Sequence, residues 1–438
     1  MKTNRMYRYR VYPTQEQEAL FRRWQGILRF LWNICHEQRL MGLARTQKVY
    51  LSNAEQNKEM TLLQETPGFE WIQDLQCQAR QKVTQDLDDA WKRCFKKLGG
   101  RPRFKRKGDT MRIYVPTGTV CYTITPVGNG RKSTLHTLTF EGPRYRALGP
   151  LVMVLDRALP EGRLTSWSIT KEVTEWYATA VIETEHEAPA PNTKPPVGID
   201  RGVRLILADS DGRVVPRPEF LDASKALLER AQRQLSRKKK GSANFRKAAI
   251  RVAKIQQRVA RSRSVMTDTE SRYYADRYGT VVLEDLKIGN MTRSAKGTEE
   301  NPGTQVRQKA GLNRSILGSA WGAFEAKLKY KLTDQGGQVV KVSAAYTSQT
   351  CPQCGNVDEE NRPDQATFRC TVCAYERNAD LNAAVNIRDR GLAVIAAGKP
   401  AAKVKKSVKM SRLQRKPKPE PSVKPTEAAC GGSPDGAQ

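Results

Sequence analysis

Two closely spaced pairs of cysteines are the feature that most restricts how this chain can fold. Cys351 and Cys354 form the first pair, Cys370 and Cys373 form the second, and 15 residues (355–369) separate the pairs. Four thiolates at this spacing can surround one ion tetrahedrally, and closed sites of this kind bind Zn²⁺ and stabilise a small module. The alternative is a chance cluster of reduced cysteines. The sequence therefore predicts one structural zinc in a short ribbon near the C-terminal end.

The remaining cysteines are isolated, and we interpret them as ordinary structural residues: Cys35, Cys77, Cys94, Cys121 and Cys430. The total of nine is odd, and no apolar stretch follows the first basic residues, so neither a disulfide framework nor a cleaved secretory signal is expected. No apolar run approaches the roughly 20 residues that cross a bilayer. We therefore expect a protein of the bacterial or archaeal cytoplasm (cytosol or nucleoid) that does not enter a membrane.

The charge of the chain indicates a polyanionic partner. Its 76 lysines and arginines exceed its 45 aspartates and glutamates, and the net charge of +31 is spread along the chain. Nucleic acid attracts such a chain, whereas an acidic lipid surface is the weaker alternative. The runs that we expect to bind nucleic acid are Arg237, Lys238, Lys239 and Lys240, and a helical stripe of Arg251, Lys254, Arg258 and Arg261. The alternative is that both runs are solvated helix faces without a binding role.

In the N-terminal part of the chain, a helical unit interrupts β structure. Residues 6–12 alternate as a strand does, and Pro13 ends the pattern. Thr14 and Gln17 form a capping-box start, and helical patterns continue to residue 98. Strand-like runs return at residues 111–115, 136–140, 151–155, 167–170 and 176–183. We therefore expect a small barrel or sheet assembled from sequence-distant halves.

A second region follows the linker at residues 185–196, which contains four prolines. Strands and helices alternate there as in an α/β layer. We expect strands at residues 197–200, 204–209, 213–215, 280–283 and 339–342, and helices at residues 246–263, 316–332 and 379–390. Beyond Gly398, lysines and arginines give way to Pro, Ser and Gly, a composition that predicts a disordered basic tail. The 438 residues favour two or three domains.

Three acidic residues stand where a metal-dependent nuclease needs carboxylates. Asp200 ends the apolar strand Val-Gly-Ile-Asp, Glu284 ends Val-Val-Leu-Glu in the same way, and Asp380 opens the last helix. Hydrolysis of a phosphodiester commonly uses two Mg²⁺ ions held by several carboxylates. Each acid alone could be a strand-end or helix-start residue, but their joint order is more specific. Asp285 belongs to the opposite face of its strand and is left out.

The last helix supports this interpretation of Asp380. Its periodicity puts Asp380 on one face with Ala383, Ala384 and Ile387, and the two alanines allow close approach to a sheet. A carboxylate on such an apolar face is stabilised when it binds a metal ion.

Several motifs occur together in a fixed order. They are Gly198-Ile-Asp-Arg-Gly202, Leu283-Glu-Asp-Leu286, Tyr346-Thr-Ser-Gln349, the two cysteine pairs, and Asn378-Ala-Asp-Leu-Asn-Ala-Ala384. As a set they resemble the TnpB family of transposon-encoded RNA-guided DNA endonucleases, which is similar to compact type V CRISPR effectors. Leu235-Ser-Arg-Lys-Lys-Lys-Gly-Ser242 and Pro102-Arg-Phe-Lys105 extend the resemblance to nearly everything except the tail. One departure is Ala374, where the family often has Gly after the second cysteine pair.

The resemblance implies a multidomain α/β plus β-barrel fold. The expected parts are a wedge-like β-barrel (1–13 and 99–190), a helical recognition insertion (14–98), an RNase H-like (RuvC) domain (191–345 and 377–397), an inserted zinc ribbon that binds the target nucleic acid (346–376) and the basic tail (398–438). The metal-binding acids of the family correspond to Asp200, Glu284 and Asp380 of this chain.

The implied function is RNA-guided DNA cleavage. A guide RNA would pair with double-stranded target DNA beside a short recognition motif, and two Mg²⁺ ions in the RuvC centre would hydrolyse the backbone. The alternatives are a transposase that rejoins DNA with the same acids and an RNA-guided repressor that does not cut. Tyrosine-type transposition needs two neighbouring histidines, and this chain has only three, far apart: His36, His136 and His186. The sequence carries no signal for an oligomeric state.

Overall fold

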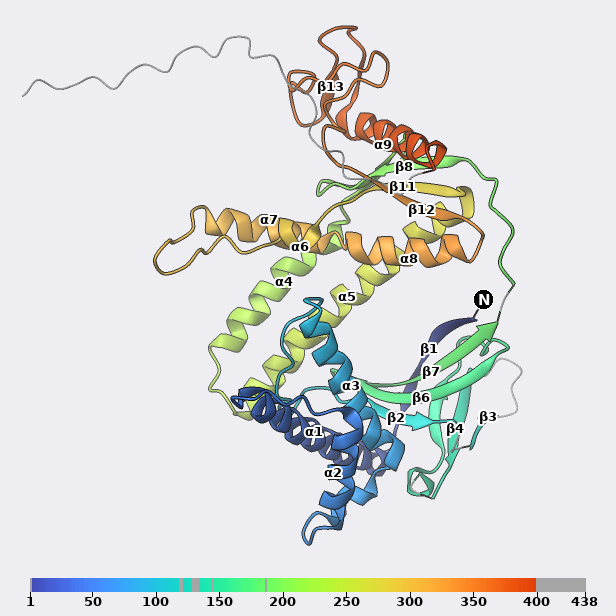
Figure 1. Cartoon of the computed structure of the whole chain (residues 1–438), viewed down its shortest axis with the longest axis vertical. Coiled ribbons are helices and arrows are strands. Elements are labelled where there is room, and N and C mark those ends of the chain that lie inside the picture. Colours follow the sequence, from blue (N-terminus) through green and yellow to red (C-terminus); the bar gives the residue numbers. More distant parts are fainter. Residues whose placement is uncertain (1, 118–120, 128–133, 144, 186, 399–438) are drawn as a thin grey trace, which may run out of the picture.

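The computed structural model describes residues 2–117, 121–127, 134–143, 145–185 and 187–398, which form two lobes. The N-terminal lobe contains β1–β7 and α1–α3, and the C-terminal lobe contains β8–β14 and α4–α9 (Figure 1). Except for Gly398, the tail predicted at residues 398–438 lies outside the described residues. None of the described helices is both long enough and apolar enough to span a bilayer.

The first strand of the chain lies inside a sheet built mainly from much later residues. β1 (Lys2–Tyr12) pairs antiparallel with β7 (Glu175–Glu185), and the strand order is β2-β6-β7-β1-β5-β4-β3. The other strands are β2 (Ile113–Pro116), β3 (Cys121–Pro126), β4 (Leu135–Glu141), β5 (Leu151–Val154) and β6 (Arg163–Glu172). Tyr9 and Val11 of β1 are buried, as the predicted alternation requires. The assembly from sequence-distant halves is confirmed.

This seven-stranded sheet curls around Trp167 of β6. The Trp167 ring lies 6.4 Å from that of Tyr9 on β1, 6.4 Å from that of Phe140 on β4 and 5.8 Å from that of Tyr122 on β3. Within the described residues, the end strands β2 and β3 do not pair with each other. The structure is therefore a curled open sheet in which aromatic packing brings the two ends together, and not a barrel closed by hydrogen bonds.

Helices α1 (Gln15–Ala44), α2 (Asn53–Glu65) and α3 (Cys77–Phe95), with the short 3₁₀ helix η1 (Glu70–Asp74), form the insertion after β1. The capping box is present: the Thr14 hydroxyl accepts a bond from the Gln17 N–H (3.2 Å), and the Gln17 side chain accepts one from the Thr14 N–H (3.0 Å). Arg39, fully buried, connects the helices, because it donates to Gln56 of α2 (2.7 Å) and pairs with Asp88 of α3 (3.1 Å).

The C-terminal lobe is a three-layer α/β structure. Its sheet has the order β10-β9-β8-β11-β12, with β8 (Pro196–Asp200), β11 (Thr280–Glu284) and β12 (Gln338–Val342) parallel to one another. β9 (Leu205–Asp209) runs antiparallel to both β8 and β10 (Val214–Pro216). Helices α5 (Ala243–Arg277) and α8 (Trp321–Thr333) cover one face, and α9 (Ala379–Ala396) covers the other.

Close packing of α9 against the sheet requires small residues. A Cβ atom added at Gly198 of β8 would lie 2.2 Å from the main-chain oxygen of Ala384, and one at Gly391 of α9 would lie 2.3 Å from a methyl carbon of Val282. Ala383 and Ala384 are buried at this contact. The close approach predicted from the two alanines is confirmed.

The helix predicted at residues 316–332 is wrong as one element. Two helices occupy the region, α7 (Val306–Gly318) and α8, and they are separated at Ser319 and Ala320. Ala320 has a left-handed backbone (φ 55°), which interrupts the helix just before Trp321. The break lets Trp321 and Phe324 turn into the core while α7 points away from it (Figure 1). Periodicity continued across the break, so the sequence did not reveal it.

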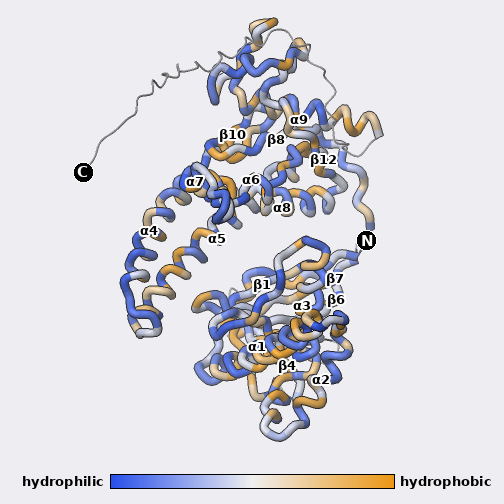
Figure 2. Tube along the Cα trace, turned by 60° about the vertical axis from the view of Figure 1, so that its left-hand side comes forward, coloured by the Kyte–Doolittle hydropathy of each residue, from blue (hydrophilic) through white to orange (hydrophobic). Residues whose placement is uncertain are grey.

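Helices α4 (Glu219–Ser236) and α5 form a long hairpin that projects from the C-terminal lobe, and its tip is hydrophilic (Figure 2). The helix expected at residues 246–263 is the middle of α5. The short helix α6 (Ile288–Met291) precedes α7.

Candidate functional site

Asp200 and Glu284 lie side by side at one edge of the C-terminal sheet. They are the last residues of the neighbouring parallel strands β8 and β11, whose register pairs Ile199 with Leu283. Side chains alternate along a strand. Because Val197, Val281 and Leu283 face α5 and α8, both acids face the opposite layer, where α9 lies.

Asp380 reaches the same place from α9. It lies in the first turn of that helix, and the side chain of Asn378 caps the turn by accepting bonds from the N–H groups of Asp380 (3.0 Å) and Leu381 (3.3 Å). The structure thus brings together Asp200, Glu284 and Asp380, which we call the acid cluster. Asp285 points away from it and pairs with Lys287 (2.5 Å) and Lys341 (3.8 Å).

The electrostatics of the acid cluster favour a bound cation. Burial, followed by the charges of Glu284 and Asp380, raises the pKa of Asp200 to about 7. Burial also raises the pKa of Glu284 and that of Asp380. Crowded carboxylates in a poorly solvated place are destabilised as anions unless a cation neutralises them. The donors are all carboxylate oxygens, which suit a hard ion such as Mg²⁺.

Two buried polar residues orient the carboxylate of Glu284. The Thr347 hydroxyl donates a hydrogen bond to Glu284 Oε1 (2.8 Å), and the side-chain amide of Asn386 on α9 donates to the Thr347 main-chain oxygen (2.9 Å). Thr347 and Asn386 are buried. Thr347 lies in the motif of residues 346–349 and Asn386 lies two residues after the motif that ends at Ala384, but nothing local to either segment indicates that they meet.

Three arginines surround the acid cluster, and sequence reasoning did not assign them to it. Arg201, buried, donates to the Glu284 main-chain oxygen and pairs with Glu325 of α8 (3.1 Å). Arg362, from the cysteine module, lies 3.9 Å from Asp380. The positive charge of Arg390 on α9 opposes the rise in the pKa of Glu284. These charges offset part of the negative potential of the cluster.

The four predicted cysteine ligands converge beside α9. The sulfur atoms of Cys351, Cys354, Cys370 and Cys373 all lie within 4.8 Å of one another, and no second cluster of three or more ligands this close occurs in the described part of the chain. The module includes the short hairpin β13 (Thr367–Arg369) and β14 (Glu376–Asn378). Four soft thiolates in this arrangement fit Zn²⁺. The carboxylate oxygens of the acid cluster do not all lie within 4.8 Å of one another, so this cluster is wider than the four-cysteine site.

The two cysteine turns have equivalent backbones. The N–H of Gly355 donates to the main-chain oxygen of Cys351 (3.0 Å), and that of Ala374 donates to the corresponding oxygen of Cys370 (3.1 Å). Both residues are left-handed, with φ of 76° at Gly355 and 58° at Ala374. Ala374 therefore adopts the glycine conformation at an energetic cost.

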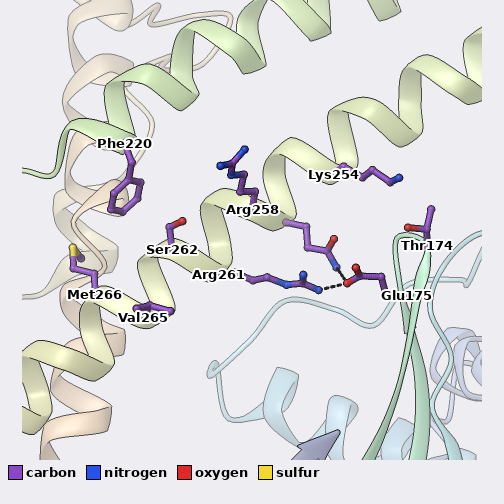
Figure 3. Close-up of a pocket in the computed structure, with 10 residues that line it drawn as sticks. Thr174, Glu175, Phe220, Lys254, Arg258, Arg261, Ser262, Val265 and Met266 are labelled. Carbon is purple, nitrogen blue, oxygen red and sulfur yellow. Dashed lines mark hydrogen bonds and ion pairs between the residues drawn. The ribbon is translucent and has the colours of Figure 1, made fainter. Parts of the chain in front are cut away.

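The predicted basic residues lie on the α4–α5 hairpin. Those of the run Arg237, Lys238, Lys239 and Lys240 are exposed in the loop between the helices, and those of the stripe Arg251, Lys254, Arg258 and Arg261 are exposed along α5. The C-terminal part of the stripe borders an open groove of about 750 Å³ between α5, Phe220 of α4 and the β6–β7 turn at Thr174 (Figure 3).

Within this stripe, Arg261 differs from the others. Its guanidinium pairs with Glu175 of the β6–β7 turn (Figure 3) and contacts the Tyr177 hydroxyl, so much of its charge is used inside the molecule. In the residues that the structure describes, Arg251, Lys254 and Arg258 form no ion pair with a carboxylate. Their charges are available to a polyanion.

The fold is that of the compact CRISPR effectors. A solved structure titled "Cryo-EM structure of the Cas12f1-sgRNA-target DNA complex" matches 88% of this chain and 99% of that chain with a TM-score of 0.56. The two sequences are 12% identical, so this likeness concerns the fold alone.

The family is shown by closer relatives in sequence. "Putative RNA-guided DNA endonuclease InsQ" of Escherichia coli (strain K12) is 32% identical over 398 residues, which are 91% of this chain and 95% of that protein. "Putative RNA-guided DNA endonuclease" of Streptomyces pristinaespiralis is 27% identical over 96% of this chain and 97% of that protein. The chain belongs to the TnpB family of RNA-guided DNA endonucleases.

Three family models match parts of the chain. They are described as "Probable transposase" (residues 179–295), "Cas12f1-like, TNB domain" (321–387) and "Helix-turn-helix domain" (1–48). The last description does not fit the structure, because the described residues of that segment form strand β1 and the single long helix α1.

Proposed function

We propose that this chain is an RNA-guided DNA endonuclease that cuts with the acid cluster. The single observation that carries this proposal is the convergence of Asp200, Glu284 and Asp380 at one sheet edge from three separate elements. Relatives that cover almost the whole chain are named RNA-guided DNA endonucleases. The guide RNA would pair with double-stranded target DNA beside a short recognition motif.

The acid cluster would hold two Mg²⁺ ions. Such ions, when bound, activate water and stabilise the leaving oxygen of a phosphodiester. Asp200, Glu284 and Asp380 would supply the ligands, and Thr347 would keep the Glu284 carboxylate in one orientation. Arg201 would hold the end of β11 in place through the main-chain oxygen of Glu284. Arg362, which lies 3.9 Å from Asp380, would bind a phosphate of the strand that is cut.

The four cysteines would hold one structural Zn²⁺. A site closed by four thiolates leaves no position for reactive water. The Zn²⁺ would stabilise the fold of the cysteine module. This module carries Arg362 and leads directly into α9, so it would help to hold Asp380 in position.

The parts of the chain would then have the following roles. The curled sheet (1–13 and 99–190) would be the wedge, the helices (14–98) the recognition insertion, and residues 191–345 and 377–397 a RuvC domain interrupted by the zinc ribbon (346–376). The basic residues of the α4–α5 hairpin would contact the guide or target backbone. Arg261 is the weakest member of this set, because Glu175 already neutralises it.

A transposase remains the second candidate, because one matching family model is described as "Probable transposase". The same acids could serve strand transfer. An endonuclease releases free ends, whereas a transposase joins one of them to another DNA.

The test is purification of the protein from its host, sequencing of bound RNA, and incubation of the complex with plasmid targets and Mg²⁺. Cleavage only of the plasmid that matches the variable part of the RNA is expected. Cutting without a match, joined products, or the absence of a discrete RNA would contradict the proposal.

A further inference from the structure

We propose that Asn386 of α9 is a positioning residue of the acid cluster, and that it acts through a short segment which couples the cysteine module to Glu284. This coupling segment (residues 344–350) lies between β12 and the first cysteine pair. Helix α9 lies between the cysteine module and the sheet, and it contacts both (Figure 1). The inference rests on the proposed function, because it takes the acid cluster as a site for a metal ion.

The backbone of the coupling segment turns sharply and is strained. Residues 344–346 are exposed, whereas Thr347 is only 4% exposed. Tyr346 has a left-handed backbone (φ 61°), and its main-chain oxygen accepts bonds from the N–H groups of Gln349 (3.2 Å) and Thr350 (3.1 Å). A left-handed residue other than glycine is costly, and it persists only where surrounding contacts hold it. The contacts that hold this segment are therefore part of what positions Thr347.

Two asparagines on one face of α9 hold the coupling segment. The side-chain amide of Asn386 donates to the main-chain oxygens of Thr347 (2.9 Å) and Thr350 (2.8 Å). One helical turn earlier, the amide of Asn382 donates to the Thr350 oxygen (3.1 Å). Residues four apart share a helix face, so both amides reach the segment from the same side, but only that of Asn386 reaches Thr347.

The cysteine module holds the other end of the coupling segment. Asn361, fully buried in the module, donates to the Gln349 main-chain oxygen (2.9 Å), and its own side-chain oxygen accepts a bond from the Thr371 N–H (2.8 Å). Thr350 also forms an isolated antiparallel bridge with Val357 of the module. The position of the coupling segment therefore depends on the fold of the cysteine module as well as on α9.

The hydroxyl of Thr347 connects the coupling segment to the acid cluster. It lies 2.8 Å from Glu284 Oε1 and 3.2 Å from the main-chain oxygen of Ala344. A hydroxyl has one proton to donate, and a carboxylate accepts a shorter and stronger bond than a neutral oxygen does. The proton therefore goes to Glu284, and this bond fixes the orientation in which the carboxylate meets a metal ion.

Hydrogen-bond partners behind a metal ligand raise the affinity for the metal, because they hold the ligand in the orientation that binding requires. Within the described residues, the amide of Asn386 donates to two main-chain oxygens of the coupling segment and to no carboxylate. Its effect on the acid cluster therefore passes through Thr347. Asn382 is a natural comparison, because it is the same kind of residue on the same helix and is equally buried, but it holds Thr350 alone.

The test measures metal binding separately from cleavage, with Mn²⁺ as the probe and electron paramagnetic resonance as the readout. Thr347→Val keeps the shape of the side chain without the hydroxyl, and Asn386→Leu removes the amide. Each should weaken Mn²⁺ binding about tenfold and raise by the same factor the Mg²⁺ concentration at which guided cleavage is half-maximal. Thr347→Ser retains the hydroxyl and should recover most of the affinity. The double variant T347V/N386L should bind no more weakly than the weaker single variant, because both changes act on one hydrogen bond.

Asn382→Leu is the matched control. It should lower the melting temperature about as much as Asn386→Leu does, yet leave Mn²⁺ binding unchanged, because its amide does not reach Thr347. Asp200→Ala tests the proposed function itself: equal Mn²⁺ binding by this variant and the wild type would show that the acid cluster is not a metal site. If Asp200→Ala loses Mn²⁺ but Thr347→Val binds it like the wild type, the positioning role is overturned and the nuclease function stands. Equal weakening by Asn382→Leu and Asn386→Leu would overturn it as well.

Discussion

At the scale of single residues, Glu284 and Asp285 form a natural matched pair. They are adjacent and both acidic, but Glu284 is buried and belongs to the acid cluster, whereas Asp285 forms surface ion pairs on the other face of the strand. Their different surroundings come from strand alternation alone.

Glu284→Ala should lower DNA cleavage by more than about a thousandfold and leave RNA and target binding nearly unchanged. The proposed role of Glu284 is to hold a metal ion, whereas many lysines and arginines hold the polyanion. Asp285→Asn should cleave like the wild type. The measurement is guided cleavage alongside a gel shift on the same target.

Asp200→Ala and Asp380→Ala should behave like Glu284→Ala, and combining them should add little, because one lost ligand already disables the centre. Cutting near the wild-type rate by any one variant would remove that residue from the site. Survival in all three would contradict the nuclease proposal.

The second residue-scale prediction concerns the two cysteine turns. Ala374→Gly should stabilise the cysteine module by up to about 1 kcal/mol, because glycine adopts a left-handed backbone without steric cost. Gly355→Ala, at the equivalent turn, should destabilise it by a similar amount. The rate at which a chelator removes the proposed Zn²⁺ should fall in the first variant and rise in the second. Equal rates in both would show that these turns are not strained.

At the scale of elements, the start of α1 is clamped to the β6–β7 turn by Glu18. Its carboxylate pairs with Lys171, accepts a bond from the Trp176 indole (3.3 Å) and pairs with Arg22 (2.9 Å). The hydrogen bond from Lys171 is the main reason that the pKa of Glu18 is lowered to about 2.

A group with a lowered pKa stabilises the folded state above its unfolded pKa of about 4.5 and loses that contribution as the pH falls toward about 2. We expect Glu18→Gln to be less stable than the wild type by about 1 kcal/mol at neutral pH, since the group is partly exposed. The difference should shrink between pH 4.5 and the folded pKa. Denaturant unfolding of both proteins across that window is the measurement, and a constant difference would contradict it.

At the scale of the whole molecule, ion pairs and hydrogen bonds rather than a shared core connect the two lobes. The apolar clusters of the described residues each belong to one lobe. Between the lobes, Arg5 of β1 pairs with Asp334 after α8 (2.7 Å), and Arg261 of α5 pairs with Glu175. Exposed pairs are weak individually and are screened by salt. We therefore expect the two lobes to move relative to each other.

Breaking these pairs should therefore widen the molecule without unfolding it. We expect R5D/R261Q to increase the radius of gyration measured by small-angle scattering at low salt, and wild-type protein at ~1 M salt to do the same. Adding Asp334→Arg to Arg5→Asp restores one pair with reversed charges and should recover part of the compactness. Equal radii for all variants and salt concentrations would show that other contacts hold the lobes together.

Local features of this protein were determined by the sequence itself. Residue spacing within one turn or one strand set the capping box at Thr14, the alternation around Tyr9, the four cysteine ligands and the position of each acid at the end of its element. These patterns depend on neighbours a few residues away, and backbone geometry translates them directly into structure.

Only the tertiary structure decided which distant groups meet. The β8–β11 register sets Glu284 beside Asp200, α9 brings Asp380 and Asn386 to them, and the break at Ala320 depends on how Trp321 enters the core. Arg261 shows the same limit: its place in a basic stripe was visible, but its partner Glu175 lies in the other lobe. Such contacts depend on pairing and packing of segments tens to hundreds of residues apart, about which local periodicity carries no information.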